Sequence, residues 1–165
     1  MILPEEAAPF EQQEPALFIE QVHPTLRVDE DALERLIRQA LSSEARPLRY
    51  LGIVLTDRET VWDLNRTYLG HDYPTDVLSF PLGDQAADDA VDGEVYVDLD
   101  TADERHAEFG MTFEGEVRRY VLHGVLHLLG YDDATPLDKQ TMTALEDRYL
   151  ALPSYPGPDG PAPSH

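Results

Sequence analysis

Short apolar runs recur along the middle of the chain and predict β-strands. Each run is bounded by polar or turn-forming residues, and the last one alternates apolar with polar side chains. The four runs lie at residues 17–22, 50–55, 76–80 and 93–99. Pro81 directly follows the third run and is expected to stop it, because proline cannot donate a backbone hydrogen bond to a neighbouring strand.

Between and after these runs, apolar residues recur three and four positions apart, which is the period of an amphipathic helix. Asp29 is predicted to cap a first helix, and Thr56 with Glu59 is predicted to form a capping box that opens a second. Residues 101–129 are expected to be helical in two pieces, and Thr135 to cap a last helix. The pattern favours an α/β (α+β) fold in which a small mixed four-stranded sheet is covered by about five helices.

The two ends of the chain differ from its middle. Residues 1–15 are acidic and aperiodic, and residues 153–165 are rich in proline and glycine, so both are predicted to be disordered extensions. Residues 16–152 are predicted to form a single domain. No run is long enough to span a membrane, and the acidic start does not resemble a signal peptide. We therefore expect a cytoplasmic protein without a membrane partner.

The chain is strongly acidic and contains no cysteine. Its 165 residues carry 33 acidic and 12 basic side chains, a formal net charge of −21. The absence of cysteine excludes disulfides, thiolate metal sites and a cysteine nucleophile. Nucleic acids are normally bound through clustered Lys and Arg, so the charge argues against a generic polyanion binder and against a DNA partner. The charge has two interpretations. It is either an acidic surface suited to high salt or an acidic composition that has no functional role.

A histidine pair near the end of the long helical stretch is the main candidate for chemistry. His123 and His127 are four residues apart, so on a helix their imidazoles share a face and can converge on one ion. Asp133 follows beyond Gly130, where the chain can turn back, and could supply a third ligand. Three protein ligands leave a fourth position open for water, which is typical of catalytic zinc. We predict one Zn²⁺ ion here. Asp132 is the alternative ligand, or an acceptor for an imidazole N–H, and the histidines could instead be hydrogen-bonded core residues.

The same spacing occurs in zinc peptidases, but one position argues against a peptidase. Those enzymes place a glutamate directly after the first histidine as the general base. This chain has Gly124 there.

Two separated motifs resemble those of a known family. HGVLHLLGYD at residues 123–132 looks like the signature of the bacterial endoribonuclease YbeY family, a family of rRNA maturation factors. Residues 64–68 (LNRTY) and 75–81 (TDVLSFP) resemble the second motif of that family, and GEV at 93–95 is similar to its Gly-Asp-Ile segment. The likeness extends in order over about residues 17–150.

The resemblance implies a single-strand-specific, metal-dependent endoribonuclease. Such an enzyme would act in 16S rRNA 3′-end maturation and ribosome quality control, with ribosomal RNA and the ribosome as partners. Its ion would polarise a phosphodiester oxygen or activate water.

Two positions depart from the pattern of the family. Asp133 stands where a third histidine is usual, and Leu69 stands where an arginine is usual. A carboxylate is a sound zinc ligand but makes the ion a weaker Lewis acid. A lost arginine matters more if it contacts phosphate, because bidentate guanidinium contacts are hard to replace. His71 could partly substitute for it, or be an exposed turn residue.

Three further side chains are candidates for substrate contacts or proton transfer. Arg66 and Arg119 could hold phosphates, although either could equally belong to a solvated helix face. Asp132 could handle a proton or simply stabilise a turn. Two other functions stay open alongside the endoribonuclease. One is a metal-dependent hydrolase of another substrate class, and the other is a non-catalytic ribosome-associated factor with a structural metal.

Overall fold

Four strands form one mixed sheet in this computed structural model, which describes residues 16–70, 75–83 and 89–152. Their order across the sheet is β1-β2-β4-β3. The first three are parallel and β3 is antiparallel to β4 at one edge. The strands are β1 (Ala16–Gln21), β2 (Leu48–Thr56), β3 (Val77–Pro81) and β4 (Val91–Asp98). The predicted mixed four-stranded sheet is confirmed.

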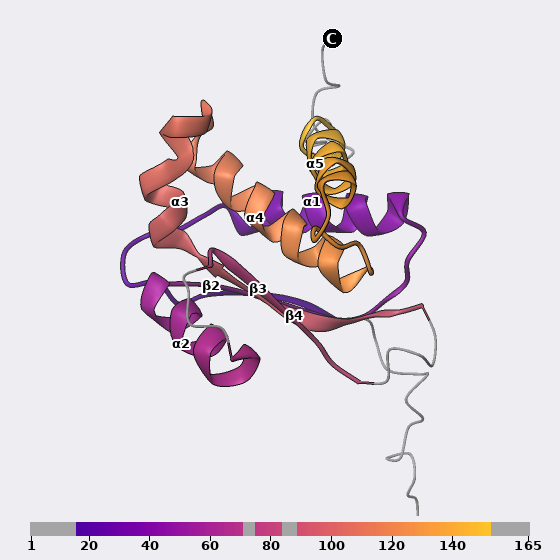
Figure 1. The fold of residues 1–165 in the computed structure, drawn as a ribbon, viewed down its shortest axis with the longest axis horizontal. Coiled ribbons are helices and arrows are strands. Elements are labelled where there is room, and N and C mark those ends of the chain that lie inside the picture. Colours follow the sequence, from indigo (N-terminus) through magenta and orange to yellow (C-terminus); the bar gives the residue numbers. More distant parts are fainter. Residues whose placement is uncertain (1–15, 71–74, 84–88, 153–165) are drawn as a thin grey trace, which may run out of the picture.

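Five α-helices in the same ranges cover this sheet, as predicted. They are α1 (Glu30–Ser43), α2 (Arg58–Leu69), α3 (Leu99–Arg105), α4 (Phe113–Leu128) and α5 (Pro136–Leu150). Figure 1 shows α1, α4 and α5 on one side of the sheet and α2 on the other. The stretch predicted to be helical in two pieces contains α3, a 3₁₀ turn at His106–Phe109 and α4. Gly110 ends the turn with a φ of +68°, so the predicted break lies there.

Two local predictions at strand ends are wrong. Pro81 belongs to β3 rather than stopping it, because an edge strand tolerates a missing N–H that points away from its neighbour. The cap of α2 is Asp57, whose side chain accepts a hydrogen bond from the N–H of Thr60 at 2.8 Å. Thr56, predicted as the cap, is instead paired with Asp98 as the last residue of β2.

The hydrophobic core lies between the sheet and the layer of α1, α4 and α5. Close approach of α4 to the sheet depends on Gly124. A Cβ atom at this position would lie 2.5 Å from Val95 Cγ1 and 3.1 Å from Val77 Cγ2. The hydroxyl of Ser79 also donates to the Gly124 carbonyl at 2.8 Å. The glycine that argues against a peptidase therefore has a packing role on the face of α4 that meets the sheet.

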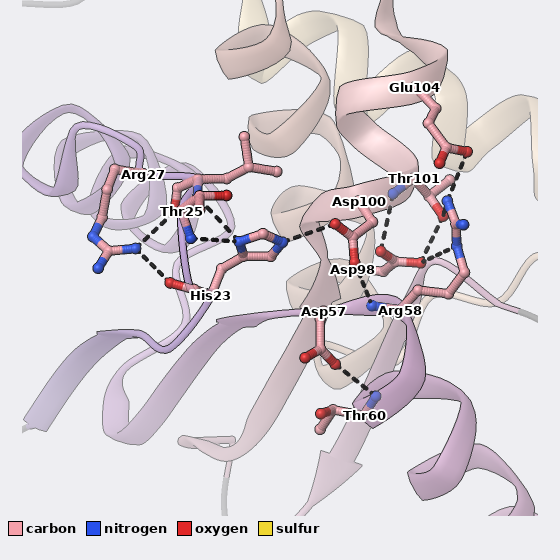
Figure 2. Close-up of polar contacts among 11 residues, drawn as sticks. His23, Thr25, Arg27, Asp57, Arg58, Thr60, Asp98, Asp100, Thr101 and Glu104 are labelled. Carbon is pink, nitrogen blue, oxygen red and sulfur yellow. Dashed lines mark hydrogen bonds and ion pairs between the residues drawn. The ribbon is translucent and has the colours of Figure 1, made fainter.

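A cluster of polar side chains connects the end of β1 with the beginnings of α2 and α3 (Figure 2). We call His23, Arg58 and Asp100 the His23 cluster. The Nε2 of His23 donates to Asp100 Oδ1 at 2.8 Å, and its Nδ1 accepts from the backbone N–H groups of Thr25 and Leu26 at 3.1 and 3.0 Å. The other oxygen of Asp100 accepts from the backbone N–H of Arg58 at 3.0 Å. Both ring nitrogens of His23 are thus used within the protein.

Three predictions concern the ends of the chain and membranes. The extensions predicted at residues 1–15 and 153–165 lie outside the described residues. No helix within the described ranges is long and apolar enough to cross a membrane.

Candidate metal centre

The two predicted histidine ligands project from the last two turns of α4. Thr112 caps the start of the helix by accepting from the N–H of Gly115 at 2.9 Å, and the helix ends at Leu128. Both histidines are half-buried, with His123 one turn before His127 and adjacent to Gly124. Packing of Gly124 against the sheet fixes this part of α4 beside β3.

The turn after α4 brings Asp133 back to the histidines. Gly130 adopts a φ of +105°, a conformation that L side chains rarely adopt, and reverses the chain. Asp133 Oδ2 then lies 3.2 Å from His123 Nε2 and 3.5 Å from His127 Nε2. Asp132, the alternative ligand, is exposed, and its Oδ1 accepts from the backbone N–H of Asp133 at 2.8 Å. Of the two aspartates, Asp133 is the one that joins the histidines.

The spacing of the three donor atoms fits one small ion. The Nε2 atoms of His123 and His127 are 3.2 Å apart, so the three separations run from 3.2 to 3.5 Å. A tetrahedral zinc with bonds near 2.0–2.1 Å keeps its ligand atoms about 3.3 Å apart. Two imidazoles and a carboxylate also form a donor set that zinc-like metals accept. We call His123, His127 and Asp133 the candidate metal centre.

Glu146 of α5 orients the first histidine. Its Oε2 lies 2.7 Å from His123 Nδ1, and its Oε1 accepts from Arg119 at 2.9 Å. A proton on Nδ1 satisfies this contact and leaves the Nε2 lone pair directed at the candidate ion, the arrangement common in metal sites. Burial disfavours the imidazolium of His123, but the carboxylates of Glu146, Asp133 and Asp76 outweigh it and raise the pKa of the ring.

Sequence reasoning did not identify Glu146. Its contact joins residues 23 positions apart and depends on how α5 packs on α4. The available signal was a glutamate among the apolar positions of the last predicted helix. It is only 5% exposed, and a buried carboxylate requires a partner.

The predicted substrate-contacting residues lie in different surroundings. The guanidinium of Arg119 pairs with Glu146 and, at 2.7 Å, with Asp147, so the structure shows it supporting the orienting glutamate. Arg66 lies on the exposed side of α2, paired with Asp63 and stacked over the Trp62 ring at 5.0 Å. A phosphate contact stays a prediction for both arginines. His71 lies outside the described residues.

A cleft of about 680 Å³ opens beside the candidate metal centre. Asn65 and Leu69 of α2 line one side, and β3 with the preceding residues Thr75 and Asp76 runs along it. His123, His127, Leu128 and Asp133 line the other side. The described residues of the lining include no Lys or Arg, and Leu69, where the resemblance led us to expect an arginine, is among them. Burial raises the pKa of the Asp76 carboxyl in this cleft.

The turn that carries Asp133 is tied to the other helices. Glu44, the residue that follows α1, accepts from the hydroxyl of Tyr131 at 2.7 Å and also from that of Tyr149 on α5. Burial and the contact with Glu44 raise the pKa of Tyr149 to about 12, so its hydroxyl stays a donor. Arg46 donates to the Leu129 carbonyl at 2.8 Å. These bonds hold the turn in the place where Asp133 reaches the histidines.

Comparison with known proteins points to one family. Residues 18–152 match the family model described as Endoribonuclease YbeY. The Endoribonuclease YbeY of Salinibacter ruber is 49% identical over 148 residues, covering 86% of this chain and 94% of that protein. The one of Chlorobium luteolum is 39% identical over 132 residues, covering 79% and 94%.

A solved structure shares the fold. The solution structure of TM1509 from Thermotoga maritima aligns with a TM-score of 0.55 and 29% identity, over 82% of this chain and 86% of that one.

Proposed function

The chain belongs to the endoribonuclease YbeY family, and we propose from that membership that it is a metal-dependent endoribonuclease that cleaves single-stranded RNA. We further propose Zn²⁺ as the single ion, and 16S rRNA 3′-end maturation and ribosome quality control in the cytoplasm as its setting. Ribosomal RNA and the ribosome would be its partners. The observation that carries the proposal is the convergence of three donor atoms, 3.2–3.5 Å apart, at the wall of an open cleft.

The residues around the cleft have three different proposed roles: binding the ion, orienting a ligand and donating a proton. His123, His127 and Asp133 would hold the ion, which when bound supplies Lewis-acid polarisation of a phosphodiester oxygen and activation of water. Glu146 accepts a hydrogen bond from the Nδ1–H of His123, and this leaves the Nε2 of His123 free to bind the ion. Asp76 lines the same cleft, and we propose its carboxyl as the group that donates a proton to the leaving oxygen.

Leu69 favours a second candidate function. It places an apolar side chain in the cleft at the position where the family pattern has an arginine. A cleft that lacks this cation could hold a structural ion in a ribosome-associated factor without cleaving RNA.

A cleavage assay separates these candidates. The full chain is loaded with Zn²⁺ and incubated with single-stranded and duplex RNA, and the bound metal is counted for each variant. We expect cleavage of the single strand, one ion per chain, and loss of both in His123→Ala and Asp133→Ala. Asp138→Ala removes a half-buried carboxylate from the start of α5 that lies outside the candidate metal centre, and it serves as the matched control.

Two outcomes would contradict the proposal. Undiminished cleavage by a metal-free His123→Ala protein would remove the candidate metal centre from the mechanism. A zinc-loaded wild-type protein that cleaves neither RNA would favour the non-catalytic factor.

A further inference from the structure

β3 is an edge strand with one side of its backbone unpaired by the sheet. Within the described residues β3 pairs only with β4, in an antiparallel register that matches Leu78 with Tyr96 and Phe80 with Glu94. Two bonds show which residues face β4: Leu82 N–H donates to the Asp92 carbonyl at 2.8 Å, and the Asp76 carbonyl accepts from Asp98 N–H at 2.9 Å. In antiparallel pairs the facing and outward residues alternate. The even-numbered residues of β3 therefore bond to β4.

The odd-numbered residues turn their backbone groups away from the sheet. These are Val77, Ser79 and Pro81, and the first two each offer an outward N–H. Among the described residues, none accepts from either group. Pro81 has the same orientation but no N–H, so the outward donors of β3 are those of Val77 and Ser79. Thr75 Oγ1 already donates to the Val77 carbonyl at 3.3 Å.

This edge borders the cleft of the candidate metal centre. The lining includes Val77 and Ser79 together with His123 and His127, and no Lys or Arg of the described chain joins them. An anionic strand entering this cleft therefore meets backbone N–H groups and no Lys or Arg side chain of the described residues. Alternate residues of a strand lie about 6.7 Å apart, of the order of the spacing of successive phosphates in an extended single strand.

We propose that the free edge of β3 is a subsite for the backbone of extended single-stranded RNA, with the N–H groups of Val77 and Ser79 donating to phosphate oxygens beside the candidate metal centre. The inference rests on the proposed function. It also gives a reason for single-strand selectivity, because a straight strand edge suits an extended backbone and a duplex backbone winds away from it. An extended peptide could pair with the same edge, but family membership favours RNA as the occupant.

Amide hydrogen exchange tests the subsite directly. The zinc-loaded full chain is followed by NMR with and without a 2′-O-methyl oligouridine, and the length of the oligonucleotide is checked after the measurement to show that it was not cleaved. We expect exchange at Val77 and Ser79 to slow by about tenfold or more in the complex, since a hydrogen bond to a charged oxygen is worth that much. Leu78 and Phe80 already bond to β4, so their slow exchange should not change.

A pair of substitutions provides an independent measurement. Ser79→Pro removes the outward N–H, and Ser79→Ala removes only the hydroxyl that contacts Gly124. We expect oligouridine affinity to fall by about tenfold or more in Ser79→Pro and to stay within about twofold in Ser79→Ala. Circular dichroism confirms that both variants fold; if Ser79→Pro does not, the exchange measurement decides.

Each contrary result has its own meaning. Wild-type protein that binds and cleaves RNA with unchanged exchange at both amides overturns the subsite and leaves the proposed function standing. Wild-type protein that neither binds nor cleaves RNA overturns both. Protection of the two amides by an extended peptide but not by oligouridine replaces RNA with a peptide as the occupant.

Discussion

Two of the histidine–carboxylate contacts among the described residues, His23 with Asp100 and His123 with Glu146, differ in which ring nitrogen they leave available. In the His23 cluster, Asp100 and two backbone N–H groups satisfy both ring nitrogens, and the side chain is 7% exposed. In the candidate metal centre, Glu146 takes only the Nδ1 of His123, and the side chain is 26% exposed. The Nε2 of His123 is directed instead at the donors of His127 and Asp133.

This difference shows what marks a histidine as a ligand. A carboxylate contact fixes the tautomer in both places, so it does not separate structural from metal-binding histidines. The deciding feature is whether the other ring nitrogen keeps a free lone pair close to further atoms that could bind the same ion. His23 joins secondary-structure elements, whereas His123 and His127 present such nitrogens to a cleft.

Removing one histidine from each site should give the largest difference in zinc affinity between the two sites. We expect His127→Ala to lose about a thousandfold or more in zinc affinity, because two ligands remain. His23→Ala should keep one zinc per chain and lose about 2 kcal/mol of unfolding free energy, because Asp100 and two N–H groups lose their partner. Metal analysis after dialysis and urea unfolding measure the two effects. Loss of zinc from a folded His23→Ala protein would contradict this division.

The two carboxylates that orient the histidines offer the next test. Glu146→Gln keeps the shape of the side chain but loses its charge, and we expect zinc affinity to fall about 10- to 100-fold. Asp100→Asn is the matched change in the His23 cluster and should leave zinc affinity unchanged. Competition with a chelator measures both affinities. Equal zinc affinities in the two variants would show that Glu146 does not support the candidate metal centre.

Gly124 tests whether the position of α4 matters to the metal centre. Gly124→Ala would bring a methyl group to 2.5 Å from Val95 Cγ1, and we expect a loss of about 1–3 kcal/mol of unfolding free energy with weakened zinc binding. In Gly115→Ala the nearest atoms, on Met111 and Thr112, lie 3.1 Å away, so its loss should be smaller. Chemical unfolding with and without zinc compares them. A Gly124→Ala protein as stable as wild type would mean that α4 can move.

The smallest expected effect is the acid sensitivity that Asp100 contributes to the His23 cluster. Burial opposes ionisation of Asp100, but hydrogen bonds from the Arg58 backbone and from His23 outweigh it and lower the pKa of the carboxyl. Its contribution to stability is therefore present above its ordinary pKa near 3.8 and is lost as the pH falls through the lowered value. Between pH 5 and pH 3, Asp100→Asn should lose less stability than wild type in thermal unfolding. Equal losses would show that Asp100 does not carry this pH dependence.

The sequence predicts that the three candidate metal ligands lie close together because these residues are local. His123, His127 and Asp133 lie within eleven residues, so helix period and the turn at Gly130 bring them together. The number of strands and the approximate helix boundaries also follow from the spacing of apolar residues within each segment. Asp57 replaced Thr56 as a cap because strand pairing extends β2 by one residue, which period alone does not show.

Contacts between distant segments could not be predicted in the same way. The pairing of Glu146 with His123, and of His23 with Asp100 77 residues away, depends on how helices pack on the sheet. Arg119 shows the same limit, since its charge suggested a phosphate contact and its neighbours on α5 proved to be two carboxylates. The order β1-β2-β4-β3, which places β3 at the edge beside the cleft, is likewise a property of the folded chain.

The nearness of the three ligands in sequence has a consequence for folding. An unfolded chain keeps residues 123–133 together, so it retains part of its affinity for zinc through two histidines and an aspartate. Ligand binding stabilises a fold only by the difference between native and unfolded affinities. Zinc should therefore raise the melting temperature by less than its native affinity implies. The stabilisation that zinc does provide comes from contacts that only the folded chain makes, namely those of Glu146 with His123 and of Glu44 with Tyr131.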